Sequence, residues 1–174
     1  MKAIVPHKGT STALARHEEP KEPWRDADWQ KLWLSLKAKS WSSLAVVPAG
    51  PGGPPEFALT IAVTLARIGI VHLGTPVHVA DATSIPLTHL EQFSEEVRRV
   101  KQEGELVLIA LAPVTENPIT VSLAKAADSA VLCVLMDLMS LTDSKKTVER
   151  IGAARFVGSA VFHSNGSPGM APKK

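Results

Sequence analysis

Hydrophobic positions along the chain fall into two kinds of segment that alternate in order. Short, largely apolar runs are typical of buried strands, and they predict strands at residues 44–47, 75–81, 106–111, 129–136 and 155–162. Between them, apolar residues recur every three or four positions, which predicts helices at residues 29–39, 56–69, 86–103, 117–127 and 142–151. Strands and helices that alternate with short links predict an α/β fold with a mainly parallel sheet and helices on both faces.

Local signals set the limits of several helices. Asp26 or Asp28 is a suitable N-cap for the first helix, and Thr142 or Asp143 is a suitable N-cap for the last. The third helix begins at Pro86 and ends at Gly104. Its apolar stripe, which we expect to face the core, consists of Leu87, Leu90, Phe93, Val97 and Val100.

The two ends of the chain differ in composition from its centre. Residues 1–23 are polar and contain Pro6, Pro20 and Pro23, so we expect a flexible tail. The alternative is a docking peptide that becomes ordered on a partner. Residues 24–163 are expected to form a single domain, and residues 164–174 (SNGSPGMAPKK) are expected to be disordered.

The tryptophans are concentrated in one part of the chain. All four lie within 18 residues, at Trp24, Trp29, Trp33 and Trp41, and two of them belong to the apolar stripe of the first helix. A helix that packs on the sheet explains this stripe. Because tryptophan is enriched among the residues that dominate binding energy, the four tryptophans are also candidates for a partner-binding patch.

A loop rich in glycine and proline joins the first strand to the second helix, where nucleotide-binding proteins hold phosphates. A P-loop there requires G-x-x-x-x-G-K-[ST], in which backbone amides cradle the phosphates, the lysine neutralises them and the hydroxyl binds magnesium. In the best register, this loop has proline in place of the lysine and glutamate in place of the hydroxyl. Prolines lack an amide donor and a carboxylate repels phosphate, so we predict no phosphate binding of this kind. The loop residues are Ala49, Gly50, Pro51, Gly52, Gly53, Pro54, Pro55 and Glu56.

Ligands in parallel α/β folds bind where the carboxyl ends of the strands meet. Three such ends are residues 48–55, 81–84 and 112–117, which we expect to lie together. Asp81 ends the second strand and is interpreted as a cap of the turn that follows. The helix after the glycine-rich loop is apolar around most of its circumference, interrupted only by Arg67, so we expect it to be buried on several sides.

Composition narrows the functional classes. The chain has 174 residues, is 45% hydrophobic and carries a formal net charge of +2, which does not indicate nucleic-acid binding. Its one cysteine, Cys133, lies in an apolar run and is interpreted as a core residue rather than a nucleophile. No apolar segment predicts secretion or membrane insertion, which favours a cytoplasmic protein. The six histidines show no metal-ligand spacing, so neither a metal nor a cofactor is predicted.

Three segments carry a resemblance to a known superfamily. VVPAGPGGPPEF is similar to the loop S-x-x-P-G-E-G-K-[ST]-T of the MinD/ParA-type deviant P-loop ATPases, with Pro51 and Gly52 at the family's P-G. VHVADAT is similar to the strand that ends in D-x-D, and ELVLIALAP is similar to the Walker B strand. Over residues 28–163, the order of elements most resembles the bacterial tyrosine-kinase branch that regulates capsular and exopolysaccharide synthesis. This resemblance implies a P-loop NTPase-like, three-layer α/β/α fold.

The residues that carry chemistry in that superfamily are replaced here. Its signature lysine falls at Gly50, the second acid of D-x-D at Thr83 and the Walker B acid at Ala110, so that Asp81 remains as a vestigial acid. The tyrosine kinases of the branch also phosphorylate a tyrosine-rich C-terminal tail, and this chain contains no tyrosine. The resemblance therefore implies a pseudo-ATPase or pseudokinase rather than an enzyme.

The leading hypothesis is a non-catalytic protein-interaction or regulatory scaffold of a membrane-associated assembly that binds a protein partner. By resemblance, this assembly would serve polysaccharide synthesis or export. The alternative is a nucleotide-binding switch of the MinD/ParA type, with little or no hydrolysis. It would bind ATP or another nucleotide through the amides of Gly50–Gly53 and through Asp81, and the resemblance implies a homodimer.

Two further classes are disfavoured. A ParA-like partner of a positioning or division system with residual DNA affinity would need more positive charge than this chain carries. Direct membrane insertion is not expected, because the C-terminal end lacks the amphipathic helix by which MinD-type proteins hold membranes.

Overall fold

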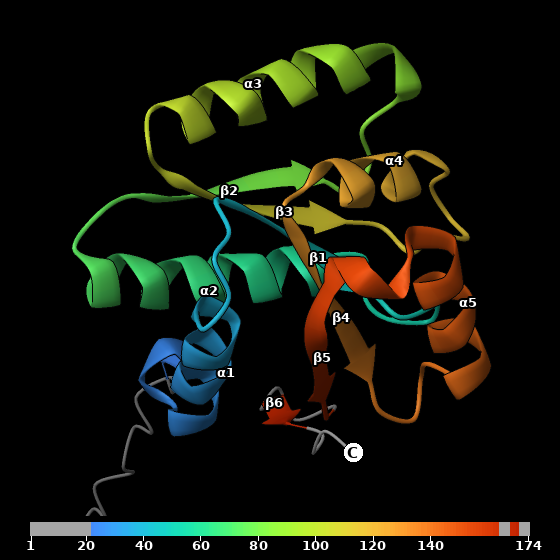
Figure 1. Cartoon of the computed structure of the whole chain (residues 1–174). Coiled ribbons are helices and arrows are strands. Elements are labelled where there is room, and N and C mark those ends of the chain that lie inside the picture. The colour runs from blue at the N-terminus through green and yellow to red at the C-terminus, as the bar shows by residue number, and fades with distance from the viewer. Residues whose placement is uncertain (1–21, 164–167, 171–174) are drawn as a thin grey trace, which may run out of the picture.

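The computed structural model describes residues 22–163 and 168–170 of the chain. Its centre is a six-stranded sheet with the order β2-β3-β1-β4-β5-β6 (Figure 1). The first five strands of the sequence pair in parallel, and β6 runs antiparallel to β5. The strands are β1 (Ser43–Pro48), β2 (Val77–Ala82), β3 (Leu106–Leu111), β4 (Ser129–Leu135), β5 (Phe156–Phe162) and β6 (Pro168–Met170). The predicted mainly parallel sheet is confirmed.

Helices cover both faces of this sheet. The α-helices are α1 (Ala27–Lys37), α2 (Phe57–Leu73), α3 (Leu90–Gln102), α4 (Ile119–Ala126) and α5 (Leu141–Ile151). Three short 3₁₀ helices are η1 (Pro23–Arg25), η2 (Leu87–His89) and η3 (Ala153–Arg155). One face of the sheet is covered by α1 and α2, and the other by α3, α4 and α5 (Figure 1). The predicted three-layer α/β/α arrangement is confirmed.

The alternation of side chains along β1 explains why both faces are covered. Leu44 and Val46 belong to the core beneath α1 and α2, whereas Ala45 and Val47 belong to the core on the opposite face. All four side chains are fully buried. A strand that is apolar at every position must bury both faces, and helices on both sides meet this requirement.

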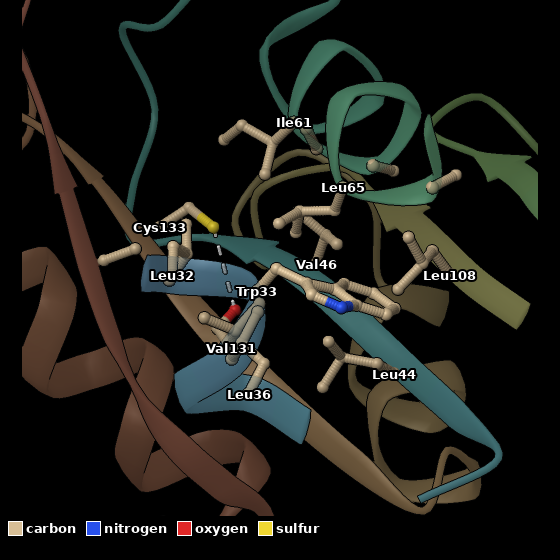
Figure 2. Packing of buried hydrophobic residues seen from close by; sticks show 14 of the residues in the cluster. Leu32, Trp33, Leu36, Leu44, Val46, Ile61, Leu65, Leu108, Val131 and Cys133 are labelled. Carbon is tan, nitrogen blue, oxygen red and sulfur yellow. Dashed lines mark hydrogen bonds between the residues drawn. The ribbon is translucent and has the colours of Figure 1, made fainter. Parts of the chain in front are cut away.

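The core beneath α1 and α2 contains the largest buried side chain. Figure 2 shows Trp33 of α1 and Leu65 of α2 packed over Val46 and Leu108 of the sheet. Cys133 of β4 lies in the same cluster and is fully buried, which confirms its interpretation as a core residue. Burial raises the pKa of the Cys133 thiol, so the thiol stays protonated and is a poor nucleophile.

The N-caps of α1 and α5 show one prediction that was right and one that was wrong. Asp26 accepts a hydrogen bond from the amide of Asp28 at 2.8 Å, which confirms Asp26 as the cap of α1. The cap of α5 is Ser140, whose Oγ accepts a hydrogen bond from the amide of Asp143 at 3.0 Å. The prediction of Thr142 or Asp143 was wrong because α5 begins at Leu141, so the extended residue that can reach a free amide is Ser140.

The predicted stripe of α3 is correct except at its start. Leu87 is 73% exposed, because the chain first forms η2 and the α-helix begins only at Leu90. The change of helical geometry turns Leu87 away from the face that the later residues share. The remaining stripe residues pack against the core, and these are Leu90, Phe93, Val97 and Val100.

The ends of the chain also depart from the prediction. Residues 168–170, which were expected to be disordered, form β6 and pair with Ala160–Phe162 of β5. The sequence of β6 has little strand propensity, so the pairing depends on the backbone groups that β5 offers at the edge of the parallel sheet. Residues 1–21 of the predicted tail lie outside the described residues, and Pro23 begins η1.

Candidate functional site

The three strand ends singled out in the sequence meet around one cavity of about 250 Å³, called the strand-end cavity below. The loop after β1 contributes Pro48, Gly50, Gly53, Pro54 and Pro55. The loops after β2 and β3 contribute Thr83, Ser84, Ala112, Pro113 and Glu116. The expectation that these segments lie together is therefore confirmed.

The walls of the strand-end cavity do not suit an anion. Most of the lining is apolar, with Phe57, Leu111 and Met139 joining the prolines. Among the described residues, no lysine or arginine lines the cavity, and its one ionisable side chain is the carboxylate of Glu116. A phosphate in this cavity would meet a negative charge and no positive one.

The first half of the loop after β1 is held by β4 and α5. The amide of Ala49 donates to the carbonyl of Cys133 at 2.8 Å, and the Thr147 hydroxyl donates to the carbonyl of Ala49 at 2.9 Å. Gly50 is buried, and a Cβ at this position would lie 2.7 Å from Cβ of Asp143. Because real Cβ atoms do not approach so closely, only glycine fits here. The position that holds the signature lysine in the resembling superfamily is therefore sterically closed.

The second half of the loop packs against residues 136–140, which connect β4 to α5. Gly52 has a positive φ of 98°, and a Cβ there would lie 3.0 Å from the carbonyl oxygen of Leu138. A Cβ at Gly53 would lie 3.0 Å from the terminal methyl of Met139. The glycines thus allow two loops of the same chain to come together, a packing role that sequence analysis did not anticipate.

The remaining acid of the D-x-D motif has a structural role. Asp81 is exposed, and its Oδ1 accepts hydrogen bonds from the amide of Thr83 at 3.0 Å and from its hydroxyl at 2.6 Å. This confirms the interpretation of Asp81 as a cap of the turn after β2. Ala110, at the Walker B position, pairs in register with Asp81 and is fully buried. The Walker B position therefore offers no carboxylate to hold magnesium, and one oxygen of Asp81 is engaged in its own turn.

The two residues at the P-loop lysine and hydroxyl positions supply neither a cation nor a hydroxyl. Pro55 and Glu56 are both exposed, and Pro55 lines the strand-end cavity. Glu56 stands at the N-cap of α2, where its side chain makes no capping hydrogen bond. Its negative charge still suits a helix N-terminus.

Three of the four tryptophans are core residues rather than exposed contact residues. Trp29, Trp33 and Trp41 are at most 5% exposed. Trp29 packs on Phe162 with ring centroids 5.4 Å apart, and Trp33 packs edge-on against Trp41 at 6.1 Å. These three side chains therefore belong to the core, where Trp29 and Trp33 of the α1 stripe cover α2 and the sheet, and their part in partner binding stays a prediction. Packing on the sheet was the other interpretation of the stripe.

Trp24 differs from the other three, because it is only partly buried. Its ring lies under the guanidinium group of Arg67, 4.6 Å from the ring centroid. It also borders a second cavity, of about 450 Å³, between η1, α1 and α2. This cavity, called the helix groove below, is lined by Trp24, Arg25, Gln30, Trp33, Leu34, Ile68, Val71 and His72.

Sequence analysis missed the helix groove. It treated α2 as buried on several sides, but Ile70 is 45% exposed, Val71 is 80% exposed and Leu73 is 37% exposed. The predicted helix ended at residue 69, so these exposed side chains lie in the last turn of α2 beyond it, where Trp33 of α1 contacts His72. A signal was present in the sequence. Ile70, Val71 and Leu73 extend the apolar residues of the helix to more sides than one sheet face can bury.

The part of the chain that the structure describes contains neither a metal-binding cluster nor a membrane-spanning helix. No group of three or more histidine, cysteine, aspartate or glutamate side chains is placed to hold a metal ion there. Within residues 22–163 and 168–170, no helix has both the length and the apolar character needed to cross a membrane.

Comparison with known proteins relates the chain to two solved structures. No protein-family model and no curated protein sequence matches it. The chimerical protein CapA2B2 superposes with a TM-score of 0.61 and 17% identity, over 84% of this chain and 87% of that one. The BceF tyrosine kinase domain superposes with a TM-score of 0.54 and 16% identity, over 78% of this chain and 74% of that one. The chain therefore has the α/β fold of these two structures.

Proposed function

We propose that this protein is a non-catalytic pseudo-ATPase or pseudokinase that acts as a protein-interaction and regulatory scaffold. The observation that carries the proposal is the closed loop after β1. Gly50 abuts Asp143 of α5, so a side chain has no room at the position of the signature lysine. The neighbouring cavity is lined by Glu116 and by no basic side chain among the described residues.

The chemistry of phosphoryl transfer supports this proposal. Such transfer depends on positive groups and metal ions that position and stabilise the phosphates. At the corresponding positions, this chain has Pro55, Glu56 and Ala110, and the last of these is fully buried. A single change could restore one of these groups, but it could not supply both a cation and a metal-binding carboxylate.

The surface around the strand-end cavity, called the strand-end face below, supports a role in protein interaction. Leu87 at the start of η2, Leu138 in the turn after β4 and Leu141 at the start of α5 are each more than half exposed. Exposed apolar side chains that gather near one end of a domain are a feature of protein-binding surfaces. In our proposal, the partner belongs to a membrane-associated assembly for polysaccharide synthesis or export, and the protein acts in the cytoplasm. The fold shared with CapA2B2 and with a tyrosine kinase domain supports this assignment.

A nucleotide-binding switch is the second candidate, and one observation favours it. The amides of Gly50, Gly52 and Gly53 donate hydrogen bonds to no other described residue. Backbone amides in a glycine-rich loop can bind an anion without help from a lysine. In this alternative, the protein would bind ATP or another nucleotide as a homodimer and would hydrolyse it little or not at all.

Thermal unfolding of the full chain separates the two candidates. Melts would be recorded with millimolar Mg·ATP, Mg·ADP or Mg·GTP, and with Mg·tripolyphosphate as a control for effects of anions alone. A nucleotide at a hundred times its Kd adds about 2.7 kcal/mol, which raises the Tm of a chain of this size by roughly 5–10 °C. We expect the nucleotides to cause no larger change than tripolyphosphate.

The result that would overturn the proposal is equally specific. It is a rise of Tm with one nucleotide that tripolyphosphate does not cause and that Asp81→Ala removes. Asp81 is a suitable probe because the switch hypothesis uses this carboxylate, whereas its hydrogen bonds to Thr83 are local to one exposed turn.

A further inference from the structure

The helix groove between η1, α1 and α2 is a surface of different character from the strand-end face. Its apolar wall includes Leu34, Ile68 and Val71, of which Leu34 is 53% exposed and Val71 is 80% exposed. Leu34 lies on α1 while Ile68 and Val71 lie three residues apart on α2, so two helices present apolar side chains to the same space. Large apolar side chains that stay this exposed at the edge of a formed cavity mark a binding surface.

The walls of the groove are held in position by specific contacts. Nε1 of Trp33 donates a hydrogen bond to Nδ1 of His72 at 3.1 Å, which joins α1 to the last turn of α2. Gln30 donates from Nε2 to the carbonyl of Trp24 at 3.3 Å, and Arg67 stacks on the Trp24 ring. The groove is therefore formed before anything binds, which lowers the entropic cost of binding.

The guanidinium groups at the groove are those of Arg25, which lines it, and Arg67, which covers the outer face of Trp24. Arg25 forms an ion pair with Glu22 outside the lining. Among the described residues, no carboxylate lines the groove itself. A partner that carries carboxylates beside its apolar residues would be attracted to this rim, whereas a basic partner would be repelled.

The chain's own first residues do not match these charges. Residues 1–21 contain four basic and two acidic residues, so this segment is itself positively charged. The groove is therefore more complementary to another protein than to the segment that precedes it.

From this arrangement we infer that the helix groove binds an amphipathic helix of a partner protein, with apolar anchors on one face and acidic residues beside them. Two helices that border an apolar groove commonly accept a third helix through anchors spaced three, four and seven residues apart. The inference deepens the proposed function and rests on it, because it assigns to the scaffold one contact surface and the chemistry of its partner.

The experiment uses the full chain and two fluorescent helical peptides of designed sequence. Both carry the same leucine stripe, but one has glutamate and the other lysine at the flanking positions. Binding is measured by fluorescence polarisation at low and at physiological salt. We expect the acidic peptide to bind at least tenfold more tightly than the basic one, a difference of about 1.4 kcal/mol. We also expect salt to weaken the acidic complex.

Variants of the protein locate the peptide. Val71→Asp and Leu34→Asp should each weaken the acidic peptide at least tenfold, because they place a charge in the apolar wall and repel the flanking glutamates. Met136→Asp is the matched control, since Met136 is 41% exposed after β4 and does not line the groove, and it should leave affinity unchanged. Circular dichroism melts confirm that each variant is folded.

Four results would overturn the inference. They are absence of binding at millimolar peptide, equal binding of the basic peptide, an equal loss in Met136→Asp, and displacement of the acidic peptide by a synthetic peptide of residues 1–21. The last result would assign the groove to the chain's own segment. Failure of the proposed function has a different signature, because it would appear as nucleotide-dependent stabilisation in the melts and not in the peptide assay.

Discussion

Trp33 of α1 and His72 of α2 are joined by a hydrogen bond of 3.1 Å from the indole Nε1 to the imidazole Nδ1. An indole N–H can only donate, so the imidazole nitrogen is the acceptor of this bond. The indole ring of the same Trp33 is fully buried and lies against Gly69, one turn before His72. This one side chain therefore sets the distance between two helices and forms one wall of the groove between them.

Substitution at Gly69 tests that distance. A Cβ added there would lie 2.6 Å from Cη2 of Trp33 and 3.0 Å from Cγ2 of Val77. Alanine favours a helix over glycine by about 1 kcal/mol, but overpacking of a tight core costs about 1–3 kcal/mol. We expect Gly69→Ala to lower the free energy of unfolding by about 1 kcal/mol, measured by urea denaturation.

Two controls separate overpacking from other effects of alanine. Gly158→Ala should be close to neutral, because a Cβ there meets nothing within 4 Å. In a Trp33→Leu background, Gly69→Ala should destabilise less, because the ring atoms that the added Cβ meets most closely are gone and Val77 alone remains. An equal loss from Gly69→Ala with and without Trp33 would contradict the steric explanation.

The carboxylate of Asp128 provides a test by pH. It accepts hydrogen bonds from the amides of Ser42 and Ser43, both at 2.9 Å, and from Nζ of Lys101 at 2.6 Å. Burial on its own raises the pKa of Asp128, but the bonds to Lys101, Ser42 and Ser43 outweigh it and hold the pKa below its ordinary value of 3.8. The ionised form is therefore favoured by folding.

The sign of the pH effect follows from this shift. A depressed pKa in the folded state adds stability above the pKa of the unfolded chain, and this stability is lost as pH falls through the lower folded value. We expect Asp128→Asn to cost about 1–2 kcal/mol at neutral pH, since the group is partly exposed to solvent. The difference from wild type should be full above about pH 5 and shrink below about pH 4.

Urea denaturation of wild type and Asp128→Asn at several pH values measures this difference. The exposed Asp137→Asn is the matched control and should show little change at any of them, because asparagine tolerates the positive φ of 67° at this position. A gap between wild type and Asp128→Asn that stays constant from neutral to acid pH would contradict the assigned role of the carboxylate.

The sequence was informative wherever structure depends on a local pattern. The uninterrupted apolar residues of β1 require burial on both faces, and this predicted the layers on each side of the sheet. The proximity of the three strand ends could also be predicted, because parallel strands place their carboxyl ends at one edge of the sheet. Loss of the P-loop lysine could be read from Pro55 alone.

What the sequence could not show depends on contacts between distant residues. Closure of the loop at Gly50 depends on Asp143, 93 positions later in the chain, and no local pattern links them. The helix groove escaped notice for a similar reason. An apolar helix such as α2 looks buried until the structure shows that Val71 in its last turn is 80% exposed.

The loop after β1 offers the sharpest test of whether this fold still has room for a nucleotide. Gly50→Ala would place Cβ 2.7 Å from Cβ of Asp143, on the first turn of α5, where the backbone and not a flexible side chain must move. We expect it to lower the free energy of unfolding by about 1–3 kcal/mol. Gly53→Ala is the control within the same loop, and it should cost less, because its nearest neighbour is the terminal methyl of Met139, which can rotate away.

Gly50→Lys, which places the superfamily's lysine on this backbone, extends the test from stability to binding. If α5 closes the loop as the structure shows, the lysine variant should be destabilised like Gly50→Ala and gain no thermal stabilisation from Mg·ATP. Asp143→Gly removes the obstructing Cβ and should restore part of the stability lost in Gly50→Ala. A Gly50→Lys variant that is as stable as wild type and melts at a higher temperature with Mg·ATP would show that the loop is open. In that case, one added cation would be enough for nucleotide binding, and the closed loop could no longer support the pseudo-ATPase proposal.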